Sequence, residues 1–437
     1  MQILDWQTLD PQQRRAALAR PAARLRGQTL TQAQAIIDRV RADGDAAISA
    51  CTREFDGVEL TRFEVTRAEF SAARAQLQSE QLAALERAIA NVESFHRASL
   101  PQPATLEVQP GVLCERLIRP LGAVGLYVPA GSAPLPSTVI MLAVPARIAG
   151  CPQRVLCTAP QADGLANAAV LVAAQLCGIE QVFKIGGAQA IAALAYGSQS
   201  VPKVAKIFGP GNAWVTAAKQ LVAADPAGAA LDMPAGPSEV LVIADDSARA
   251  EFVAADLLAQ AEHDPQAQAL LLTTCRTLAQ QVSAALTRQM SGLSRLEILR
   301  QSIASSRILL VPDLQTAVAI SEDYAPEHLL IQTRAPRALL AGIHHAGSVF
   351  LGSWSPEPLG DYCSGTNHVL PTYGYARAYS GLSVTDFTRR MTVQELTAQG
   401  LRDLGPTAST LARLEGLDAH AAAVELRLAA LRDGCAA

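Results

Sequence analysis

The chain has 437 residues, of which 50% are apolar and 17% are charged, so its length and composition predict a globular protein of about two to three domains and exclude a disordered chain. Its 36 Lys and Arg residues nearly balance its 40 Asp and Glu residues, and the net charge of −4 provides no general attraction for nucleic acid or an anionic membrane. We therefore expect small molecules or proteins as partners.

The N-terminus, MQILDWQTLDPQQRR, lacks the basic and then apolar layout of a secretory signal, and no apolar run approaches the length of a membrane span. These features predict a cytoplasmic protein. The eight cysteines include no CxxC pair, which argues against a thiolate zinc site and against a disulfide framework. Any metal ion would therefore be held by His, carboxylate or amide groups.

Two N-terminal segments are predicted to be helical, a tail over residues 1–28 and a longer region over residues 29–120. We expect the longer region to complete the body of the protein, with one helical stretch running from Ser79 to Ser99. The apolar residues at helical spacing near its start are Leu30, Ala33, Ile36, Ile37 and Val40.

From Leu121 onward, short apolar β-prone runs alternate with Ala-rich helical segments. This alternation predicts mostly parallel sheets covered by helices, and the runs form two series. We therefore predict an α/β fold with one α/β unit over residues 121–238 and a second over residues 239–380. The predicted strands are AVGLYV, RVLCT, QVFKIGG and AKIFGPG in the first unit, and EVLVIAD, ALLLTT, RILLVP, HLLIQT and GSVFLG in the second.

Residues 381–437 are predicted to form a helical C-terminal arm. Leu417, Ala421, Val424 and Leu428 recur at steps of three and four residues, which makes an apolar stripe that must pack against another surface. A second subunit is one candidate for that surface.

Two glycine-containing turns, GGAQA at 186–190 and GPGN at 209–212, follow predicted strands of the first unit and open helices. Glycines and helix N-termini at the carboxyl ends of parallel strands suit phosphate groups, so a dinucleotide site is one interpretation. The GxGxxG fingerprint of ordinary Rossmann domains is absent. The alternative is a pair of tight turns in which Asn212 caps the following helix.

Two pairs of polar residues in the second unit are candidates for chemistry. Gln260 and His263 are three residues apart on a predicted helix, so both can converge on a metal ion; the alternative is a polar helix end with a His near the negative end of the dipole. Glu327 and His328 enter a predicted strand and provide two proton-transfer groups; the alternative is a solvated surface pair.

The sequence GDYCSGTNH over residues 360–368 is predicted to be a polar loop, and such loops carry function more often than packing. In the tail, Gly416 ends one predicted helix and Asp418 can cap the next, which leaves His420 in its first turn and off the apolar stripe. A solvent-exposed His without a function is the alternative interpretation of His420.

These motifs occur in one order over almost the whole chain, and the sequence resembles the histidinol dehydrogenase family. The resemblance implies an enzyme that oxidises histidinol through histidinaldehyde to histidine in two NAD-linked steps, the last steps of histidine biosynthesis. The blocks that carry it are AVGLYVPAGSAPLPSTVIML, GGAQAIAALAYG, FGPGNAWV, DMPAGPSEVLVIAD, QAEHD, PEHLLI, GDYCSGTNHVLPTYGYAR and RMTVQEL.

The resemblance also implies the residues of the active site. One zinc ion per subunit is held by Gln260, His263, Asp361 and His420, a mixed N/O set that zinc accepts. Acid and base are Glu327 and His328, with Glu327 suited to activate the water that hydrates the aldehyde. The implied NAD contacts are Tyr127, Gln189 and Asn212, and the implied substrate contacts are Ser238, Glu415, His328 and the four zinc ligands.

The family fold implies two incomplete Rossmann-like units, a helical N-terminal region, and a C-terminal arm that is exchanged in a homodimer with shared active sites. One departure is Cys363, at a loop position where a small residue such as Ala is expected; beside Asp361 it could be an adventitious metal ligand or an oxidation-sensitive site. Two rival interpretations are a paralogue acting on another amino alcohol and a non-catalytic dimer. The intact set of ligands and proton-transfer groups disfavours the second rival.

Overall fold

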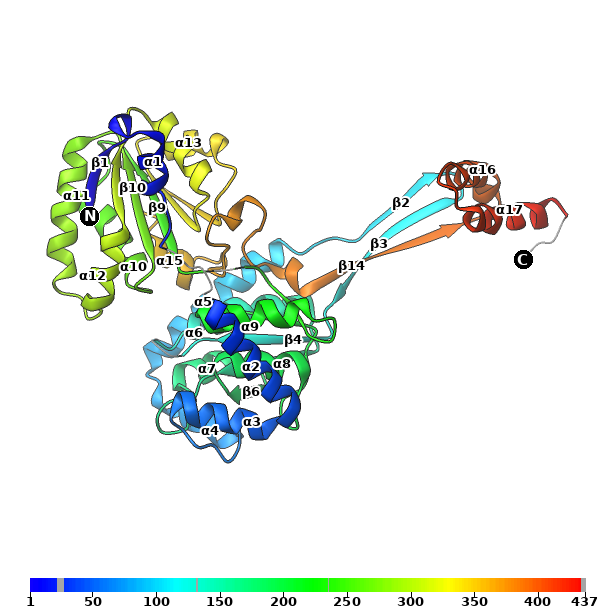
Figure 1. Cartoon of the computed structure of the whole chain (residues 1–437), viewed down its shortest axis with the longest axis horizontal. Coiled ribbons are helices and arrows are strands. Elements are labelled where there is room, and N and C mark those ends of the chain that lie inside the picture. Colours follow the sequence, from blue (N-terminus) through cyan, green and yellow to red (C-terminus); the bar gives the residue numbers. More distant parts are fainter. Residues whose placement is uncertain (22–26, 131–132, 235, 434–437) are drawn as a thin grey trace. The chain divides into compact units, whose positions relative to one another are not determined.

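A computed structural model describes residues 1–21, 27–130, 133–234 and 236–433, and the chain divides into two compact units (Figure 1). Unit 1 comprises Met1–Ser99 and Leu121–Phe387, and unit 2 comprises Leu100–Pro120 and Thr388–Ala437. A few residues of the sequence motifs lie outside the described residues, namely Gly131, Ser132, Ala235 and Cys435.

The first parallel sheet of unit 1 has, within the described residues, five strands in the order β6-β5-β4-β7-β8. Its strands are buried on both faces, as expected for a parallel sheet that is covered by helices. Because the chain builds outward from β4 to β6 and then returns to β7, the strand order reverses between β4 and β7. The strands are β4 (Ala123–Val128), β5 (Gln153–Thr158), β6 (Gln181–Lys184), β7 (Lys206–Phe208) and β8 (Ala230–Leu231).

Alternate residues of this sheet face two separate apolar clusters, with Leu126 and Leu156 on one side and Val155 and Phe183 on the other. Two sets of helices cover these faces. The first set is α4 (Arg67–Gln76), α5 (Ser79–Ala98), α6 (Pro136–Ala149) and α7 (Ala168–Leu176). The second set is α2 (Gly27–Asp43), α3 (Asp45–Cys51), α8 (Gly187–Tyr196) and α9 (Ala213–Ala224).

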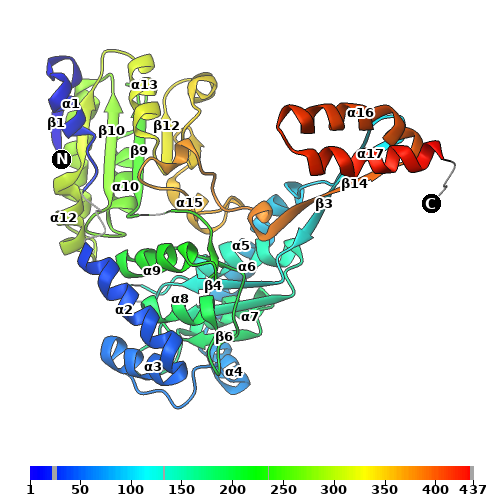
Figure 2. The same cartoon turned by 45° about the vertical axis from the view of Figure 1, so that its right-hand side comes forward.

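The second parallel sheet has, in the same described part, six strands in the order β1-β11-β10-β9-β12-β13, with a reversal between β9 and β12. Helices again cover both faces (Figure 2). The strands are β1 (Gln2–Asp5), β9 (Glu239–Ala244), β10 (Gln268–Thr273), β11 (Arg307–Leu310), β12 (His328–Gln332) and β13 (Ser348–Leu351). The helices are α1 (Pro11–Ala17), α10 (Ala250–Ala261), α11 (Arg276–Met290), α12 (Leu296–Ser305), α13 (Leu314–Tyr324), α14 (Pro336–Leu339) and α15 (Glu357–Tyr362). The α/β prediction with two parallel sheets is therefore confirmed.

Unit 2 combines an antiparallel sheet, in the order β14-β3-β2, with two helices. Strand β3 (Val112–Pro120) pairs with β2 (Ala104–Gln109) on one side and with β14 (Thr388–Leu396) on the other. Segments far apart in sequence thus meet in one ribbon, with Pro120 opposite Thr388 and Val112 opposite Leu396. The helices α16 (Ala398–Leu414) and α17 (Asp418–Arg432) lie side by side (Figure 2).

Four strands lie in segments that the sequence predicts to be helical: β1, β2, β3 and β14. Strands β2 and β14 are exposed along most of their length and β3 is mostly half-buried, so the strands of unit 2 lack the buried apolar run by which the other strands are recognised. Strand β1 is short and lies at the edge of its sheet. The partners of β1 and β14 are distant in sequence, and local patterns carry no information about such pairing, whereas β2 and β3 are close in sequence and the helical prediction for them is wrong.

The apolar stripe of the tail packs within its own chain. Gly405 of α16 lies directly against Val424 and Leu428, because a Cβ at Gly405 would stand 3.1 Å from a methyl carbon of Val424. Ala421 is buried, whereas His420 is exposed, as predicted for a residue off the stripe. Asp418 does not cap α17, whose cap residue is Leu417. The stripe therefore needs no second subunit to cover it, although other apolar residues of α16 and α17 are exposed.

Two expectations about cysteines and membranes can be compared with the structure. Every cysteine in the described ranges is a free thiol, and Cys51, Cys151, Cys157 and Cys177 are buried, in line with small core residues. In those same ranges, we find no helix with the length and apolar character that a membrane crossing requires.

A buried ion pair attaches the N-terminal segment to the second sheet. Arg20, whose side chain is 17% exposed, pairs with the fully buried carboxylate of Glu239 at the start of β9. The guanidinium also donates to the carbonyl oxygen of Tyr324 at 2.7 Å and stacks on the ring of that residue. Because a buried carboxylate without a counter-charge is unstable, Arg20 contributes more than an ordinary surface residue.

We expect Arg20→Ala to lower the free energy of unfolding by about 3 kcal/mol, because the variant leaves Glu239 buried without its cation. Urea unfolding followed by circular dichroism measures this change. The matched control is Arg276→Ala, which breaks the exposed pair with Asp5 and should cost less than about 1 kcal/mol. Equal losses in the two variants would refute a structural role for the buried pair.

Candidate active site and metal centre

Two strands of the second sheet bring the predicted acid and base together at their amino ends. His328 is the first residue of β12, and Glu327 precedes it, as the sequence predicts. Strand β9 begins beside them at Glu239, whose backbone N–H donates to Oε2 of Glu327 at 2.8 Å. Glu327 and His328 are buried, so the alternative of a solvated surface pair is wrong.

The imidazole of His328 is held in one orientation by its neighbours. Its Nδ1 lies 3.2 Å from the carbonyl oxygen of Glu239, which can only accept, so Nδ1 carries the hydrogen. Its Nε2 then faces Oδ1 of Asp361 at 3.4 Å. Burial alone lowers the pKa of His328, but the carboxylates of Glu327 and Asp361 outweigh burial and raise this pKa well above the usual value. Burial also raises the pKa of Glu327, which makes its carboxylate a stronger base.

Asp361 lies on the short helix α15 and not in the loop that the sequence predicts. Glu357 lies one turn earlier on the same helix, so both carboxylates occupy one face. Both side chains are buried, and Oε1 of Glu357 is 3.9 Å from Nε2 of His328. The sequence reasoning missed Glu357, although the four-residue spacing of Glu and Asp in PEPLGDY was a signal for two carboxylates on one helix face.

Gln260 lies in the last turn of α10, which packs against α15. His263 follows the cap residue Glu262 and lies just beyond the helix, so the prediction that both residues are on the helix is wrong for His263. Gln260 is fully buried, and His263 is exposed. Asp256, one turn before Gln260, joins the two helices because its carboxylate accepts from the backbone N–H of Glu357. Oδ2 of Asp256 also accepts from Nε2 of Gln332 at 2.7 Å, and burial raises the pKa of Asp256 to about 7.

These side chains form a set of donors that fits a metal ion. Three ligand atoms, one from each of His263, Glu357 and Asp361, all lie within 4.8 Å of one another. Among the described residues, neither amide atom of Gln260 has a hydrogen-bond partner, and the same is true of Oδ1 of Asp361 and Oε1 of Glu357. Buried polar atoms are rarely left unpaired, and zinc accepts imidazole nitrogen together with carboxylate and amide oxygen. The alternative interpretation of Gln260 and His263 as a polar helix end does not explain why these buried atoms lack hydrogen-bond partners.

The remaining predicted substrate residues lie in different parts of the chain. Ser238 directly precedes β9 and is half-buried beside Glu239. Glu415 and His420 belong to unit 2, where both are exposed at the turn between α16 and α17 and at the start of α17. The ligand atoms that converge in unit 1 thus come from α15 and from the residue that follows the end of α10, while His420 belongs to the other compact unit.

The predicted NAD residues lie at the carboxyl ends of the strands of the first sheet. Tyr127 is on β4, and its hydroxyl accepts from the backbone N–H of Gly187, which opens α8 just before Gln189. At Gly209, after β7, a Cβ would stand only 2.1 Å from the carbonyl oxygen of Tyr127, and φ is 122°, so only Gly fits this approach. The turn therefore lies where the strand order reverses, which is the usual ligand position in open parallel sheets. Asn212 caps α9 with its side chain and is exposed.

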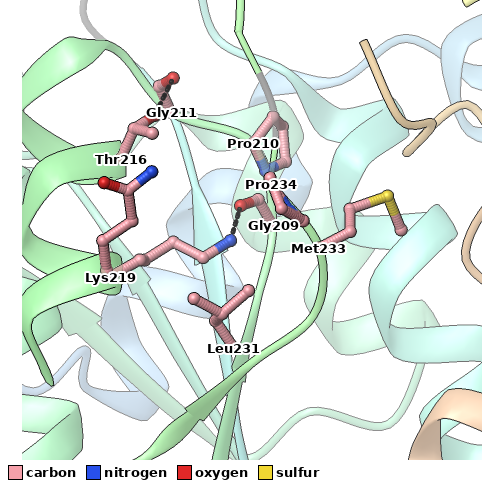
Figure 3. Close-up of a pocket in the computed structure, with 9 residues that line it drawn as sticks. Gly209, Pro210, Gly211, Thr216, Lys219, Leu231, Met233 and Pro234 are labelled. Atoms are coloured by element: carbon pink, nitrogen blue, oxygen red, sulfur yellow. Dashed lines mark hydrogen bonds between the residues drawn. The ribbon is translucent and has the colours of Figure 1, made fainter. Parts of the chain in front are cut away.

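The turn before α9 is held by Lys219 and its ion pair with Asp232, which the sequence reasoning missed. Figure 3 shows the amino group of Lys219 at the carbonyl oxygen of Gly209. Nζ of Lys219 donates to the carbonyl oxygen of Gly209 at 2.8 Å and to Oδ1 of Asp232 at 2.5 Å. Oδ2 of Asp232 accepts from the backbone N–H of Gly209 at 2.8 Å. Both peptide groups of Gly209 are thereby held, and the adjoining cavity of about 30 Å³ is lined by Gly209, Pro210, Gly211, Thr216, Lys219, Gln220, Leu231, Met233 and Pro234.

The segment after α15 attaches the site to α6 of the first sheet. Nδ1 of His368 lies 2.7 Å from the carbonyl oxygen of Asp361, and its Nε2 lies 3.2 Å from the hydroxyl of Thr138. Nδ2 of Asn367 donates to the carbonyl oxygen of Met141 at 2.7 Å. Cys363 packs against the apolar cluster around α6 and is not part of the metal-binding group found in the described ranges.

Comparisons with known proteins agree with this arrangement. The sequence model of the family described as histidinol dehydrogenase matches residues 19–428. The histidinol dehydrogenase of Xanthomonas oryzae pv. oryzae is 56% identical over 428 residues, which are 98% of this chain and 99% of the relative, and that of Vibrio parahaemolyticus is 54% identical over 430 residues, or 98% of each. The crystal structure of histidinol dehydrogenase from Elizabethkingia anophelis is 42% identical, covers 99% of both chains and has a TM-score of 0.93. The chain therefore belongs to the histidinol dehydrogenase family.

Proposed function

We propose that the protein is an NAD-dependent histidinol dehydrogenase that oxidises histidinol to histidine in two steps. In the first step, the alcohol loses a hydride to NAD and a proton to a base, which gives histidinaldehyde. Water then adds to the aldehyde, and the hydrate loses a second hydride to a second NAD and further protons to form the carboxylate of histidine. The observation that carries the proposal is the convergence of His263, Asp361 and His328 in a chain of this family.

The proposal predicts that the protein forms two NADH molecules for each histidinol consumed, with histidine as the product. Absorbance of NADH and chromatography of the product measure this stoichiometry. A histidinol analogue without the imidazole serves as control and should compete only weakly, because the imidazole is an expected zinc donor. A paralogue for another amino alcohol would bind that analogue as well as histidinol, and this result would contradict the proposed substrate.

Zinc is the metal that the family implies, and we assign its ligands as Gln260, His263, Asp361 and His420. Bound zinc would supply positive charge and open positions for the imidazole and amine of the substrate, so that the hydroxymethyl carbon is oriented toward the nicotinamide. Ser238 and Glu415 are assigned to substrate binding with these ligands. Gln260 is suited to its role because it is a neutral, fully buried donor without another partner among the described residues.

His328 is the base that takes the hydroxyl proton as hydride leaves. Its Nδ1–H is directed at the carbonyl oxygen of Glu239, so Nε2 is the nitrogen that faces the cluster where substrate is expected and that exchanges the proton. The nearby carboxylates stabilise the imidazolium that forms when His328 accepts the proton. This arrangement fixes both the tautomer and the direction of proton transfer.

NAD is assigned to residues 121–238, with contacts from Tyr127, Gln189 and Asn212. The carboxyl ends of β4 and β7 provide the switch point of the first sheet, where α8 and α9 begin, and helix N-termini at such a point suit phosphate. Burial raises the pKa of Tyr127 to about 12, so its hydroxyl stays protonated and can donate to the cofactor. The second predicted α/β unit, residues 239–380, carries Glu327, His328 and three of the four zinc ligands.

Glu327 is assigned to the second oxidation, where it activates the water that adds to the aldehyde. We expect Glu327→Gln to slow the oxidation of added histidinaldehyde by about 10²- to 10⁴-fold, the usual contribution of a general base, and to slow the first oxidation less. Single-turnover NADH formation from each substrate separates the two steps. Equal losses in both would show that Glu327 does not act on water alone.

We propose that the functional unit is a homodimer in which the arm, residues 381–437, completes the active site of the partner subunit. Unit 2 exposes large apolar side chains, among them Leu414 at 78% and Leu426 at 71% of their surface, on both sides of the turn that carries Glu415 and His420. Exposed apolar patches of this kind mark protein interfaces. We choose a second copy of the chain as the partner, because His420 can then act as a zinc ligand in that copy's active site.

A further inference from the structure

Glu357 lies in the zinc site but has no function in the assignment above. Its side chain is buried to 99%, since only 1% of the residue is exposed. In the described part of the chain, its Oε1 has no hydrogen-bond partner. One of its carboxylate oxygens lies within 4.8 Å of ligand atoms of both His263 and Asp361. The carboxylate is therefore directed into the same space as two assigned ligands.

A second buried carboxylate in this place is stable only with a proton or a cation. Glu357 and Asp361 lie one helical turn apart, and within the described residues their only ion-pair partner is His328, at 3.9 Å and 3.4 Å. One imidazole cannot compensate two buried carboxylates, and an unpaired buried charge is strongly destabilising. A divalent cation shared by both carboxylates removes this imbalance, and a cation at this point also reaches His263.

Helix α15, which carries Glu357, is attached to helix α10 at its first residue. Asp256 accepts from the backbone N–H of Glu357, and it lies on the face of α10 that also carries Gln260, shortly before His263. The first residue of α15 is thereby held against the helix that supplies Gln260.

We propose that Glu357 is a zinc ligand that completes a four-donor set within unit 1, together with Gln260, His263 and Asp361. This set holds zinc when His420 of the arm is not in place, and His420 displaces Glu357 when the arm completes the site. The inference rests on the proposed zinc site and extends it, because a chain can then load its metal before two chains assemble. Four ligands of mixed N and O type are the normal complement of zinc.

The test uses full-length protein in which His420→Ala removes the arm's ligand. We expect this variant to bind one equivalent of zinc, and the further substitution Glu357→Gln to weaken zinc binding by roughly 100-fold or more, since even outer-shell changes cost 10- to 100-fold. With His420 present, Glu357→Gln should weaken binding by less than about fivefold, because His420 then fills the fourth position. Competition with a chromogenic chelator measures the affinities.

Cobalt substitution distinguishes a ligand from a nearby charge. In the His420→Ala background, a coordinating Glu357 changes the visible ligand-field bands of Co²⁺ when it is replaced by Gln, whereas a charge outside the shell changes only the affinity. The control is Glu297→Gln, an exposed carboxylate on α12. Circular dichroism verifies that every variant is folded.

The outcomes separate this inference from the proposed function. Unchanged cobalt bands, or no zinc bound to His420→Ala although the variant is folded, would overturn the role of Glu357 and leave the four assigned ligands intact. Asp361→Asn is the reference: if it binds zinc as tightly as the unaltered chain, the zinc site itself is wrongly placed.

Discussion

Metal-free protein will lose at least about 10³-fold of its histidinol oxidation rate, and added zinc will restore it. The reason is that orientation of a bound substrate is worth about 7 to 11 kcal/mol in well-ordered sites, and zinc is assigned to orient the imidazole and amine of histidinol. In the described residues, the buried amide of Gln260 and the buried Oδ1 of Asp361 have no hydrogen-bond partner, and zinc would provide one partner for both side chains. Treatment with a chelator, removal of the chelator and stepwise return of zinc, with NADH formation as the measurement, tests this expectation.

Asp361→Asn is the matched variant for the metal experiment. It keeps the size of the side chain but removes the charge that faces His328 and the assigned metal. We expect this variant to remain inactive when zinc is returned, whereas Arg276→Ala, an exposed change on α11, should recover fully. Normal histidinol oxidation by protein that is verified to be metal-free would refute the zinc site.

Co-assembly of two inactive variants, Asp361→Ala and His420→Ala, should regenerate activity. If the arm of one chain completes the site of the other, a mixed dimer has one site with both changes and one site with neither. Random assembly makes half of the dimers mixed, so about a quarter of all sites should be intact. Activity measured after co-refolding or co-expression, with the mixed dimer isolated by two affinity tags, gives the result.

The parent homodimers are the controls for this experiment, and each should have little activity. Zinc retained by His420→Ala through Glu357 does not rescue that parent, because His420 is also assigned to contact substrate. A mixed dimer that is present but as inactive as its parents would mean that His420 acts within its own chain. This result would refute the model of arm exchange and leave the assignment of the four zinc ligands unchanged.

Much of the body could be predicted because its signals are local. The strands of the two parallel sheets are short apolar runs, and burial on both faces forces that composition on them. The strands of unit 2 could not be predicted in this way, since β14 is mostly exposed and its partner β3 lies more than 260 residues earlier. Only long-range pairing makes this segment a strand.

In the candidate site, too, local sequence signals identified some residues, whereas others were recognised only from the structure. Residue types and spacings made Gln260, His263, Glu327 and His328 candidates for metal binding and proton transfer, and the family resemblance implied their roles and added Asp361. They did not reveal that α15 is a helix, so Glu357 was not recognised beside Asp361. Lys219 and Asp232 were missed for a related reason, since a salt bridge between a helix and the strand that follows it has no local sequence signature.

By itself, the sequence determined the α/β class, the two series of strands, the family, and most of the residues capable of chemistry. These properties follow from composition, periodicity and motif order, which are written along the chain. The tertiary structure alone decided which side chains converge, which buried atoms lack partners in the described residues, and that the tail stripe packs on α16. Such facts depend on contacts between segments distant in sequence, where the free energy of burial, and not local preference, selects the arrangement.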